Sequence, residues 1–533
     1  MLHPGGETPR RRGTVHAGKA WIVALLLAAA TALAACGGST GGGSSSTTEG
    51  RPGGTIVWAK PAEVPELDPA PATNLSALQL MDEVYEPLVG LDDHLRPAPK
   101  LATSWKQISP TAYVFDIRRG VRFSNGREMT VDDVVGSLRR LTDPRLAASW
   151  AVQIGPVKRI AAKGDWQVEI VLARPNSSLV PALTGTPAAI MPMKELRDGT
   201  LDPRRAMLGT GPFKIVRHVQ DESWTLARNP YYWQRGQPLA DQVIVRIMTD
   251  DAARVAGLKD GSVDVANFDT PDAVQLLAGQ PNVKTVTTPT TDFYRLTVNS
   301  RTSIFRDKRL RQALALAINR QEISDVALGG TSEPSSAVAP SFGLCKLSDM
   351  PFGEQDLARA KQLVEEAGAT GKTVGLIASP TYKTLAPIAQ VIVPELEQIG
   401  LKVKIDQAEQ GEWLARVYTG RSDFDLDVSF FGSLVDPPMG LAWWSSAQTW
   451  HPWIPVDRTL DALIDKTHVL SPGPARDAAI EAACKRIHEN ASLIPLVTKP
   501  TVAAYRSDKV NADIPDVATS NPVRLATSSV KGG

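Results

Sequence analysis

The sequence has almost no excess charge of either sign. Its 533 residues contain 58 Lys and Arg against 57 Asp and Glu. Proteins that bind nucleic acid neutralise phosphates with surplus basic side chains, so this balance argues against a nucleic-acid partner. Hydrophobic residues make up 43% and charged residues 22% of the chain. This composition is typical of a folded protein and excludes a disordered chain or a multi-spanning membrane transporter.

The sequence also lacks the short motifs that carry catalytic or metal chemistry. It has no H-E-x-x-H, no G-x-x-x-x-G-K-[ST], no C-x-x-C, and no G-x-G-x-x-G after a strand. The seven His are scattered, and His468 and His488 are expected on solvated helix faces. Gly37–Gly41 matches G-x-S-x-G, but a Gly/Ser linker cannot supply the strained strand-to-helix turn that makes a nucleophile. We therefore predict no enzyme activity, no cofactor and no metal site.

The N-terminus has the three-part layout of an export signal. Basic residues at Arg10–Arg12 and Lys19 precede an apolar run, Trp21–Ala30, which is too short to span a bilayer. Leu33–Cys36 (LAAC) resembles a bacterial lipobox, in which the Cys becomes the lipidated first residue of the mature chain. We predict a signal peptide over residues 1–35 and lipidation of Cys36. The alternatives are an ordinary signal peptide with a chance cysteine, or twin-arginine export.

A Gly/Ser/Thr tract separates this signal from the folded body. Residues 36–54 have too little apolar surface to fold and are predicted to form a flexible tether. At about 5 to 6 Å times √n, the 18 residues Gly37–Gly54 reach roughly 23 Å, enough to hold a globular body just off a membrane.

Residues 373–431 have the most legible secondary structure. Strands are predicted at residues 374–378, 401–405 and 426–431, with helices at 382–399 and 413–418 between them. This alternation predicts a mostly parallel β-α-β-α-β sheet whose ligand edge lies beyond the C-terminal ends of its strands. Elsewhere, further strands are predicted at 113–117, 168–172 and 243–248, and helical patterns at 130–141 and 307–326.

An ordered series of short motifs spreads over nearly the whole mature chain: Gly53–Thr55, Leu67–Pro69, Tyr85–Leu88, Pro99–Trp105, Tyr113–Asn125, Thr130–Leu138, Gly209–Phe213, Arg228–Trp233, Arg309–Arg320 and Ile494–Leu496. This series resembles the extracytoplasmic solute-binding proteins of ATP-binding-cassette importers, in the dipeptide, oligopeptide and nickel group (family 5). Each motif is weak alone, whereas their common order is specific.

The resemblance implies an α/β fold, a two-lobed periplasmic-binding-protein-like clamp with an extra subdomain in the first lobe. Lobe one is expected at residues 55–292 plus 492–533, with the inserted subdomain near 81–204, and lobe two at 293–491. The chain would cross the hinge twice, near Tyr294–Val298 and near Ile494–Val497. A ligand would lie between the lobes and be buried when they close.

The loop Phe430–Pro437 (FFGSLVDP) is the sharpest indication of the ligand. It resembles the family's W-x-x-D-Y-x-D-P loop, in which peptide binders place an Asp that pairs with the ligand's ammonium. Ser433 stands at that position, and a hydroxyl supplies no negative charge to offset a buried ammonium. The free-peptide assignment is therefore open. Asp436 either contributes to the site or only caps the turn before Pro437.

Aromatic residues gather around this loop. Five of the 12 Trp fall within 41 residues, at positions 413, 443, 444, 450 and 453. Flat rings stack on peptide planes, sugars or cationic groups, although each Trp could equally serve lobe packing. The candidate ligand-binding residues are Tyr294, Phe430, Phe431, Gly432, Ser433, Asp436, Trp443 and Trp444. On the other lobe they are Thr73, Asn74 and Leu75, for which a plain surface turn is the alternative.

Two cysteines remain once Cys36 is acylated. An oxidising compartment favours a disulfide between Cys345 and Cys484. The alternative is that Cys484, on a predicted helix, is a core residue.

Together these features predict a lipid-anchored receptor on the outer face of the cell membrane. It would capture a small-molecule or peptide ligand and deliver it to the permease and ATPase subunits of an importer, and we expect a monomer. A sensory lipoprotein without transport remains open, and a surface hydrolase would need a nucleophile and a base that the sequence does not show.

Overall fold

The computed structural model describes residues 53–301, 304–418, 422–431, 434–446, 451–519 and 521–531. The predicted signal peptide, Cys36 and the tether up to residue 52 lie outside these residues. Gly50–Gly533 forms one compact unit. Within the described ranges, no helix is long and apolar enough to cross a membrane.

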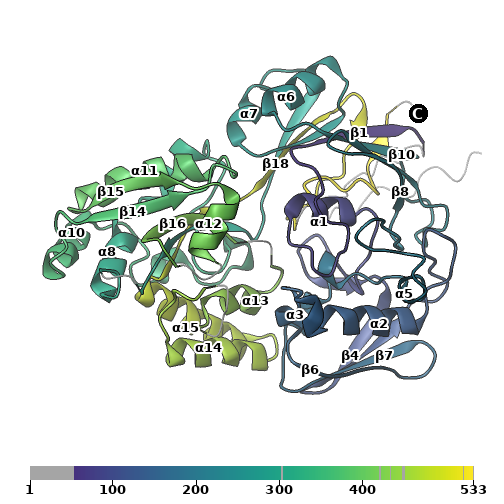
Figure 1. The fold of residues 1–533 in the computed structure, drawn as a ribbon, viewed down its shortest axis with the longest axis horizontal. Helices are drawn as coiled ribbons and strands as arrows, with labels where there is room; N and C mark the ends of the chain where they lie inside the picture. The colour runs from purple at the N-terminus through teal and green to yellow at the C-terminus, as the bar shows by residue number, and fades with distance from the viewer. Residues whose placement is uncertain are drawn as a thin grey trace, which may run out of the picture. The chain divides into compact units, whose positions relative to one another are not determined.

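A large mixed sheet is built from both ends of the described chain (Figure 1). Its order is β12 (Val283–Thr288), β18 (Thr501–Arg506), β11 (Val265–Phe268), β1 (Thr55–Lys60), β10 (Gln242–Ile247), β9 (Ser223–Arg228) and β8 (Phe213–Val219). The first strand, β1, pairs in parallel with β10 and β11, whereas β18 runs antiparallel to β11 and β12. Residues more than 440 positions apart therefore share one sheet.

A second sheet has the order β15 (Lys402–Gln407), β14 (Thr373–Ala378), β16 (Leu426–Phe430), β13 (Phe293–Val298) and β17 (Leu493–Thr498). β14 pairs in parallel with both β15 and β16, and the intervening helices are α11 (Leu385–Gln398) and α12 (Gln410–Val417). The predicted β-α-β-α-β arrangement is confirmed. Pro394 lies inside α11, as its position in the predicted helix required.

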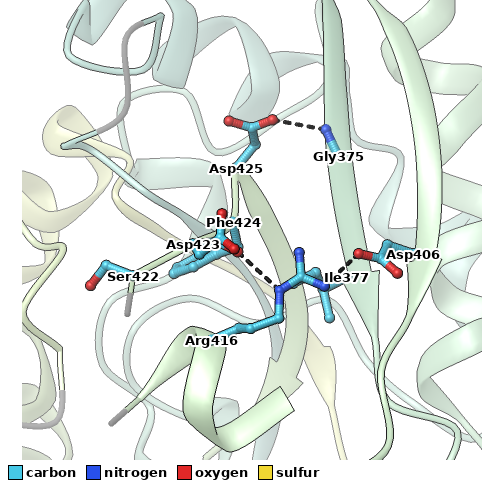
Figure 2. A pocket seen from close by; sticks show the side chains of 8 residues that line it. All are labelled: Gly375, Ile377, Asp406, Arg416, Ser422, Asp423, Phe424 and Asp425. Carbon is cyan, nitrogen blue, oxygen red and sulfur yellow. Dashed lines mark hydrogen bonds and ion pairs between the residues drawn. The ribbon is translucent and has the colours of Figure 1, made fainter. Parts of the chain in front are cut away.

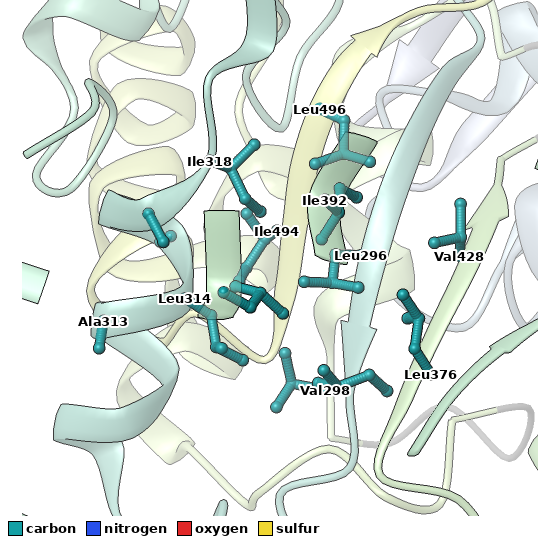
Figure 3. Close-up of a cluster of buried hydrophobic side chains, with 14 of the residues drawn as sticks. Leu296, Val298, Ala313, Leu314, Ile318, Leu376, Ile392, Val428, Ile494 and Leu496 are labelled. Carbon is teal, nitrogen blue, oxygen red and sulfur yellow. The ribbon is translucent and has the colours of Figure 1, made fainter. Parts of the chain in front are cut away.

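The main core lies on one face of this second sheet, as Figure 3 shows. Alternate residues of the strands point to it because side chains in a strand alternate between faces. α11, α8 (Lys308–Ala317) and α10 (Leu357–Glu366) cover that face. The labelled core side chains are Leu296, Val298, Ala313, Leu314, Ile318, Leu376, Ile392, Val428, Ile494 and Leu496.

The chain passes between the two sheets twice. It leaves the first sheet after β12 and enters β13, and it returns from β17 to β18. The connections are therefore residues 289–292 and 499–500, while Tyr294–Val298 and Ile494–Val497 lie inside strands. The chain was expected to return to the first lobe at residue 492. In the structure β17 still pairs with β13 in the second sheet, so the chain leaves this sheet only after residue 498.

A four-stranded antiparallel sheet, of order β4 (Ala102–Ser109), β5 (Ala112–Ile117), β7 (Gln167–Leu172) and β6 (Val157–Ala162), lies within residues 81–204. Helix α2 (Val131–Leu141) packs on it, and the backbone N–H of Thr130 donates to Asp133 at 2.9 Å at the start of the helix. We call residues 102–190 the four-stranded unit.

The described residues also contain two small sheets and ten further α-helices. β2 (Val89–Leu91) pairs with β3 (Pro97–Pro99), and β19 (Val510–Asn511) pairs with β20 (Ser529–Val530). The remaining α-helices are α1 (Leu75–Met81), α3 (Ala151–Ile154), α4 (Leu179–Ala182), α5 (Met193–Arg197), α6 (Asp251–Asp260), α7 (Pro271–Gln275), α9 (Arg320–Glu322), α13 (Pro437–Leu441), α14 (Arg458–Val469) and α15 (Pro474–Asn490).

The single helical stretch predicted over residues 307–326 is wrong. α8 ends at Ala317, Ile318 is extended, and a separate turn begins at Asn319. The side chain of Asn319 caps that turn, while its backbone N–H donates to the Glu395 carboxylate at 2.8 Å. A long-range hydrogen bond therefore replaces the helical one.

Candidate functional site

The end of strand β16 places two aromatic rings on opposite faces of the second sheet. Phe430 packs against the main core, whereas Phe431 belongs to a second cluster on the other face. This follows from the two-residue alternation of a strand. The predicted ligand loop thus begins with one ring on each side.

Phe430 belongs to an aromatic group near the connections between the sheets. Its ring meets Tyr382 edge-on at 5.0 Å and Tyr294 at 6.2 Å, and the Lys499 Nζ lies 4.9 Å from its centroid. Tyr294 is buried, and its hydroxyl hydrogen-bonds the Thr384 hydroxyl at 3.0 Å. Burial raises the pKa of Tyr294, so this phenol is neutral.

Phe431 is the centre of a larger group. Its ring stacks on Trp443 at 5.4 Å with 17° between the planes, and meets Trp444 edge-on at 5.2 Å. The Arg295 guanidinium lies 3.8 Å from the Phe431 centroid. The predicted residues Phe431, Trp443 and Trp444 are therefore brought together.

The indole N–H groups of this region differ in whether they have a hydrogen-bond acceptor. Trp444 donates to the Leu493 carbonyl at 3.4 Å, and Trp453 donates to the Val417 carbonyl at 2.8 Å. The Trp443 Nε1 is buried and has no hydrogen-bond acceptor within the described residues. A buried donor without an acceptor is costly, so it is a natural contact for a ligand oxygen.

The segment after the loop reaches the four-stranded unit. Leu434 and Met439 belong to the same buried cluster as the core of that unit, and Trp443 packs against both this cluster and the Phe431 cluster. The segment therefore joins two hydrophobic cores.

Asp436 is held in this junction by side chains from elsewhere. It forms an ion pair with Arg476 of α15 and accepts a hydrogen bond from the Ser178 hydroxyl at 2.6 Å. Although Asp436 stands at the N-cap position of α13, its side chain makes no capping hydrogen bond there. The turn-cap alternative is therefore wrong, and the carboxylate already has a cationic partner.

A small cavity of about 20 Å³ adjoins the loop, close to the volume that one ordered water needs. Three predicted residues, Phe431, Asp436 and Trp443, line it together with Thr291, Phe293, Ala337, Val338, Ala339, Phe342, Leu434, Pro437 and Gly440. Its lining is mainly apolar. Gly432 and Ser433, the remaining predicted loop residues, lie outside the described residues.

The family is decided by a match over residues 96–452, more than half of the chain. The matching family model is that of the bacterial extracellular solute-binding proteins, family 5. The chain belongs to this family.

Two curated relatives match this chain along most of their length. The chain is 27% identical over 458 residues to a di/tripeptide-binding protein of Pseudomonas aeruginosa, covering 78% of this chain and 85% of the relative. It is 27% identical over 405 residues to the glutathione-binding protein of Salmonella choleraesuis, covering 74% and 78%.

A solved periplasmic binding protein has the same fold. The DppA protein of Helicobacter pylori in complex with a peptide has a TM-score of 0.78 at 24% identity, covering 90% of this chain and 99% of the other. The predicted family and the two-lobed α/β clamp are both confirmed.

The predicted contacts of the first lobe lie on the surface. Thr73, Asn74 and Leu75 are exposed at the start of α1, where the Asn74 side chain caps the helix by accepting from the Ala77 N–H at 3.2 Å. The backbone N–H groups of Thr73 and Asn74 donate to the Glu66 carboxylate. No described contact joins them to the Phe431 group.

A larger cavity of about 210 Å³ lies beside the second sheet, between β14, β15 and α12 (Figure 2). It is lined by Gly375, Ile377, Asp406, Arg416, Ser422, Asp423, Phe424 and Asp425, none of which was predicted to bind ligand. Three of its polar side chains are engaged: Arg416 pairs with Asp406, and Asp425 accepts from the Gly375 N–H at 2.9 Å.

The sequence reasoning missed several residues of the site. Arg295, His451, Ser178 and Arg476 all contact the loop or its aromatic group. Arg295 is the only charged residue of the strand Phe293–Val298, and this position could have indicated a buried functional group. The others come from distant segments and had no local signal.

His468 and His488 correct another prediction. His488 is buried rather than solvated, with its Nε2 3.2 Å from the Ser336 hydroxyl, and His468 is half-buried beside Asn176. Among the described side chains, no group of three or more His, Cys, Asp or Glu could hold a metal ion.

Proposed function

We propose that the protein is the lipid-anchored substrate-binding component of an ATP-binding-cassette importer. It captures a peptide or peptide-like solute between its two lobes and delivers it to a membrane permease. The observation that carries this proposal is the family 5 match, together with relatives named for di/tripeptides and for glutathione.

We assign lobe one to the first sheet with the four-stranded unit, and lobe two to residues 293–498. Connections at 289–292 and 499–500 would form the hinge. Phe430, Phe431, Trp443 and Trp444 would supply aromatic walls, which suit planar amide groups because flat rings stack with little loss of rotamer freedom.

The loop favours peptide-like ligands whose binding does not depend on an ion pair with a free ammonium group. Ser433 carries no charge, and Asp436 is paired with Arg476, so neither supplies a free carboxylate to the loop. Affinity would then come from aromatic stacking and hydrogen bonds. A blocked or modified amine on the ligand costs little in such a site.

The deciding experiment is native mass spectrometry of protein purified from its own organism, followed by calorimetry. We expect a bound peptide or peptide-like mass, recovered unchanged, and binding of the same compound by the emptied protein. A bound solute without amide groups would contradict the ligand class, and a cleaved one would favour a hydrolase. Loss of labelled-ligand uptake in a strain lacking the protein would distinguish transport from sensing.

A further inference from the structure

Arg295 is a buried cation beneath the aromatic wall. Its side chain is 1% exposed, and it lies in β13 on the face that carries the Phe431 group. Its Nε donates to the Ser429 hydroxyl at 3.1 Å and its Nη2 donates to the Tyr418 hydroxyl at 2.8 Å. Ser429 in turn donates to the Asp427 carboxylate at 2.9 Å. The Ser429 and Tyr418 hydroxyls therefore fix the plane of the guanidinium.

The first route from Arg295 to Trp443 runs through the rings. The guanidinium lies 3.8 Å from the Phe431 centroid, and the Phe431 ring is nearly parallel to Trp443 at 5.4 Å. A cation over an aromatic face is attracted to the ring, more strongly when both are removed from water. Arg295 therefore holds Phe431, against which Trp443 rests.

The second route runs through His451, which is also buried. Its Nδ1 lies 2.9 Å from the Trp443 carbonyl and its Nε2 lies 3.5 Å from the Arg295 Nη1. The carbonyl and the guanidinium can be satisfied together only if Nδ1 carries the proton and Nε2 accepts. Burial and the neighbouring Arg295 lower the pKa of His451 to about 3, which keeps the ring neutral in this arrangement.

Trp443 is the outer member of this arrangement. It is only partly buried, it lines the cavity beside the loop, and its indole N–H has no acceptor within the described residues. Trp444 next to it is buried and donates to a backbone carbonyl. Of this neighbouring pair, only Trp443 therefore offers a held ring face and a free donor.

We propose that Arg295 is a positioning residue for ligand binding: through Phe431 and His451 it fixes the ring of Trp443, which stacks on a planar amide of the ligand and donates its N–H to a ligand oxygen. This inference rests on the proposed function and names the group that the site recognises. Arg295 itself does not touch the ligand.

The test compares Arg295→Gln with Arg311→Gln. Arg311 is a matched control because it is also buried in the second lobe and bonds backbone carbonyls of Asn490 and Phe305, away from the loop. The probes are reduced glutathione and N-acetylated trialanine, the second of which has no ammonium to pair, measured by calorimetry. The signal of Trp443 is the emission difference between each protein and its Trp443→Phe counterpart.

We expect Arg295→Gln to weaken probe binding by about tenfold or more and to shift the Trp443 emission to the red, because the ring loses its support. Arg311→Gln should lower the melting temperature without either change. If Arg295→Gln keeps the native affinity and emission, or if both variants change them equally, Arg295 is only structural and the inference is overturned.

His451 provides a second variant if Arg295→Gln does not fold. His451→Gln keeps a donor for the Trp443 carbonyl and should retain most of the affinity, whereas His451→Leu should lose it. Equal binding by the two variants would contradict the second route. If the native protein binds neither probe, the proposed ligand class fails, while the emission of Trp443 in the unliganded variants still decides whether Arg295 positions it.

Discussion

Asp436 forms an ion pair with Arg476 of α15, and both side chains are less than 10% exposed. The Ser178 hydroxyl of the four-stranded unit donates to the same carboxylate at 2.6 Å. The backbone N–H of Ser177 also donates to the His468 carbonyl at 2.7 Å. The segment that follows Phe431 is thus held by polar contacts from two distant parts of the chain, α15 and the four-stranded unit, beside the apolar contacts of Leu434 and Met439.

Replacing Asp436 by Asn should destabilise the protein strongly. The change leaves the Arg476 cation buried without its anion, a loss that typically costs about 3 to 5 kcal/mol. Denaturant unfolding with a constant m-value measures it. Asp143→Asn is the control, because Asp143 pairs with Arg145 on the surface and its loss should leave the midpoint unchanged.

The double variant Asp436→Asn with Arg476→Met separates the ion pair from simple packing. Removing both charges leaves no buried cation, so the double variant should be more stable than Asp436→Asn alone. Additive losses in this cycle would show that the two residues are not coupled.

The disulfide is the subject of the second prediction. The structure joins Cys345 to Cys484 of α15, across 139 positions, and Cys345 follows the segment of Ala337–Phe342 that lines the loop cavity. In the chain-entropy model, a closed loop of this length stabilises the fold by roughly 4 to 5 kcal/mol, strain aside. We expect Cys345→Ala to lower the melting temperature markedly.

Thiol labelling checks the same bond directly. In a Cys36→Ala background, the unreduced and unfolded protein should show no free sulfhydryl, and reductant should expose both. Two labelled thiols without reductant would show that the cysteines are unpaired and that Cys484 is a core residue only.

Local patterns were enough to predict the β-α-β-α-β part of the second lobe. There the strands and helices have strong periodicity, and each one packs on its neighbours in sequence. The break at Ile318 was not predictable in the same way, because it depends on the Glu395 carboxylate 76 positions away. Helical spacing on both sides of the break gave no sign of it.

The candidate site also contains residues that the local sequence indicated and residues from distant segments that it did not indicate. The strand order placed Phe431 at the expected ligand edge, the family resemblance indicated the loop, and the cluster of Trp residues indicated Trp443. Ser178 and Arg476 meet Asp436 across 258 and 40 positions, so nothing near Asp436 indicated them. His488 looked solvated because its helix is polar overall, yet α15 packs against both α14 and α8.

The third prediction concerns acid stability and His488. Burial, with the charge of Arg320 nearby, lowers the pKa of His488 from 6.5 to about 3. The unfolded chain therefore binds a proton that the folded protein excludes, so the stability contributed by this group is present above pH 6.5 and is lost as the pH falls toward 3.

Acidifying from pH 6.5 to 5.5 should destabilise the native protein relative to His488→Gln by about 1 kcal/mol. The variant removes the titrating group but keeps a polar side chain for Ser336. Denaturant unfolding of both proteins at the two pH values measures the difference. An unchanged difference would mean that His488 titrates normally in the folded protein.

Membrane attachment gives the fourth prediction. Cys36 is predicted to carry the lipid because small residues precede it and a Gly/Ser tether follows it. Cys36→Ala should release the protein into the medium, since no other anchor is predicted. Fractionation of cells expressing each form measures this. A variant that is cleaved yet still sediments with membranes would place the anchor elsewhere.

The last prediction tests the charge at the ligand loop. Ser433 stands at the position of the first Asp in the W-x-x-D-Y-x-D-P pattern that this loop resembles, and Asp436 is paired with Arg476. Simple dipeptides with free amines should therefore bind the native protein weakly. Ser433→Asp should raise the affinity for these dipeptides by about ten- to a hundredfold, because a restored charge pair contributes roughly 1.5 to 3 kcal/mol.

Ser433→Asn is the matched control, with similar volume and no charge, and should bring no gain in affinity. Calorimetry with alanyl-alanine and its N-acetylated form measures both effects. The gain should appear only for the free amine, since the acetylated dipeptide has no ammonium to pair. Tight binding of the free dipeptide by the native protein would show that another acid supplies the charge.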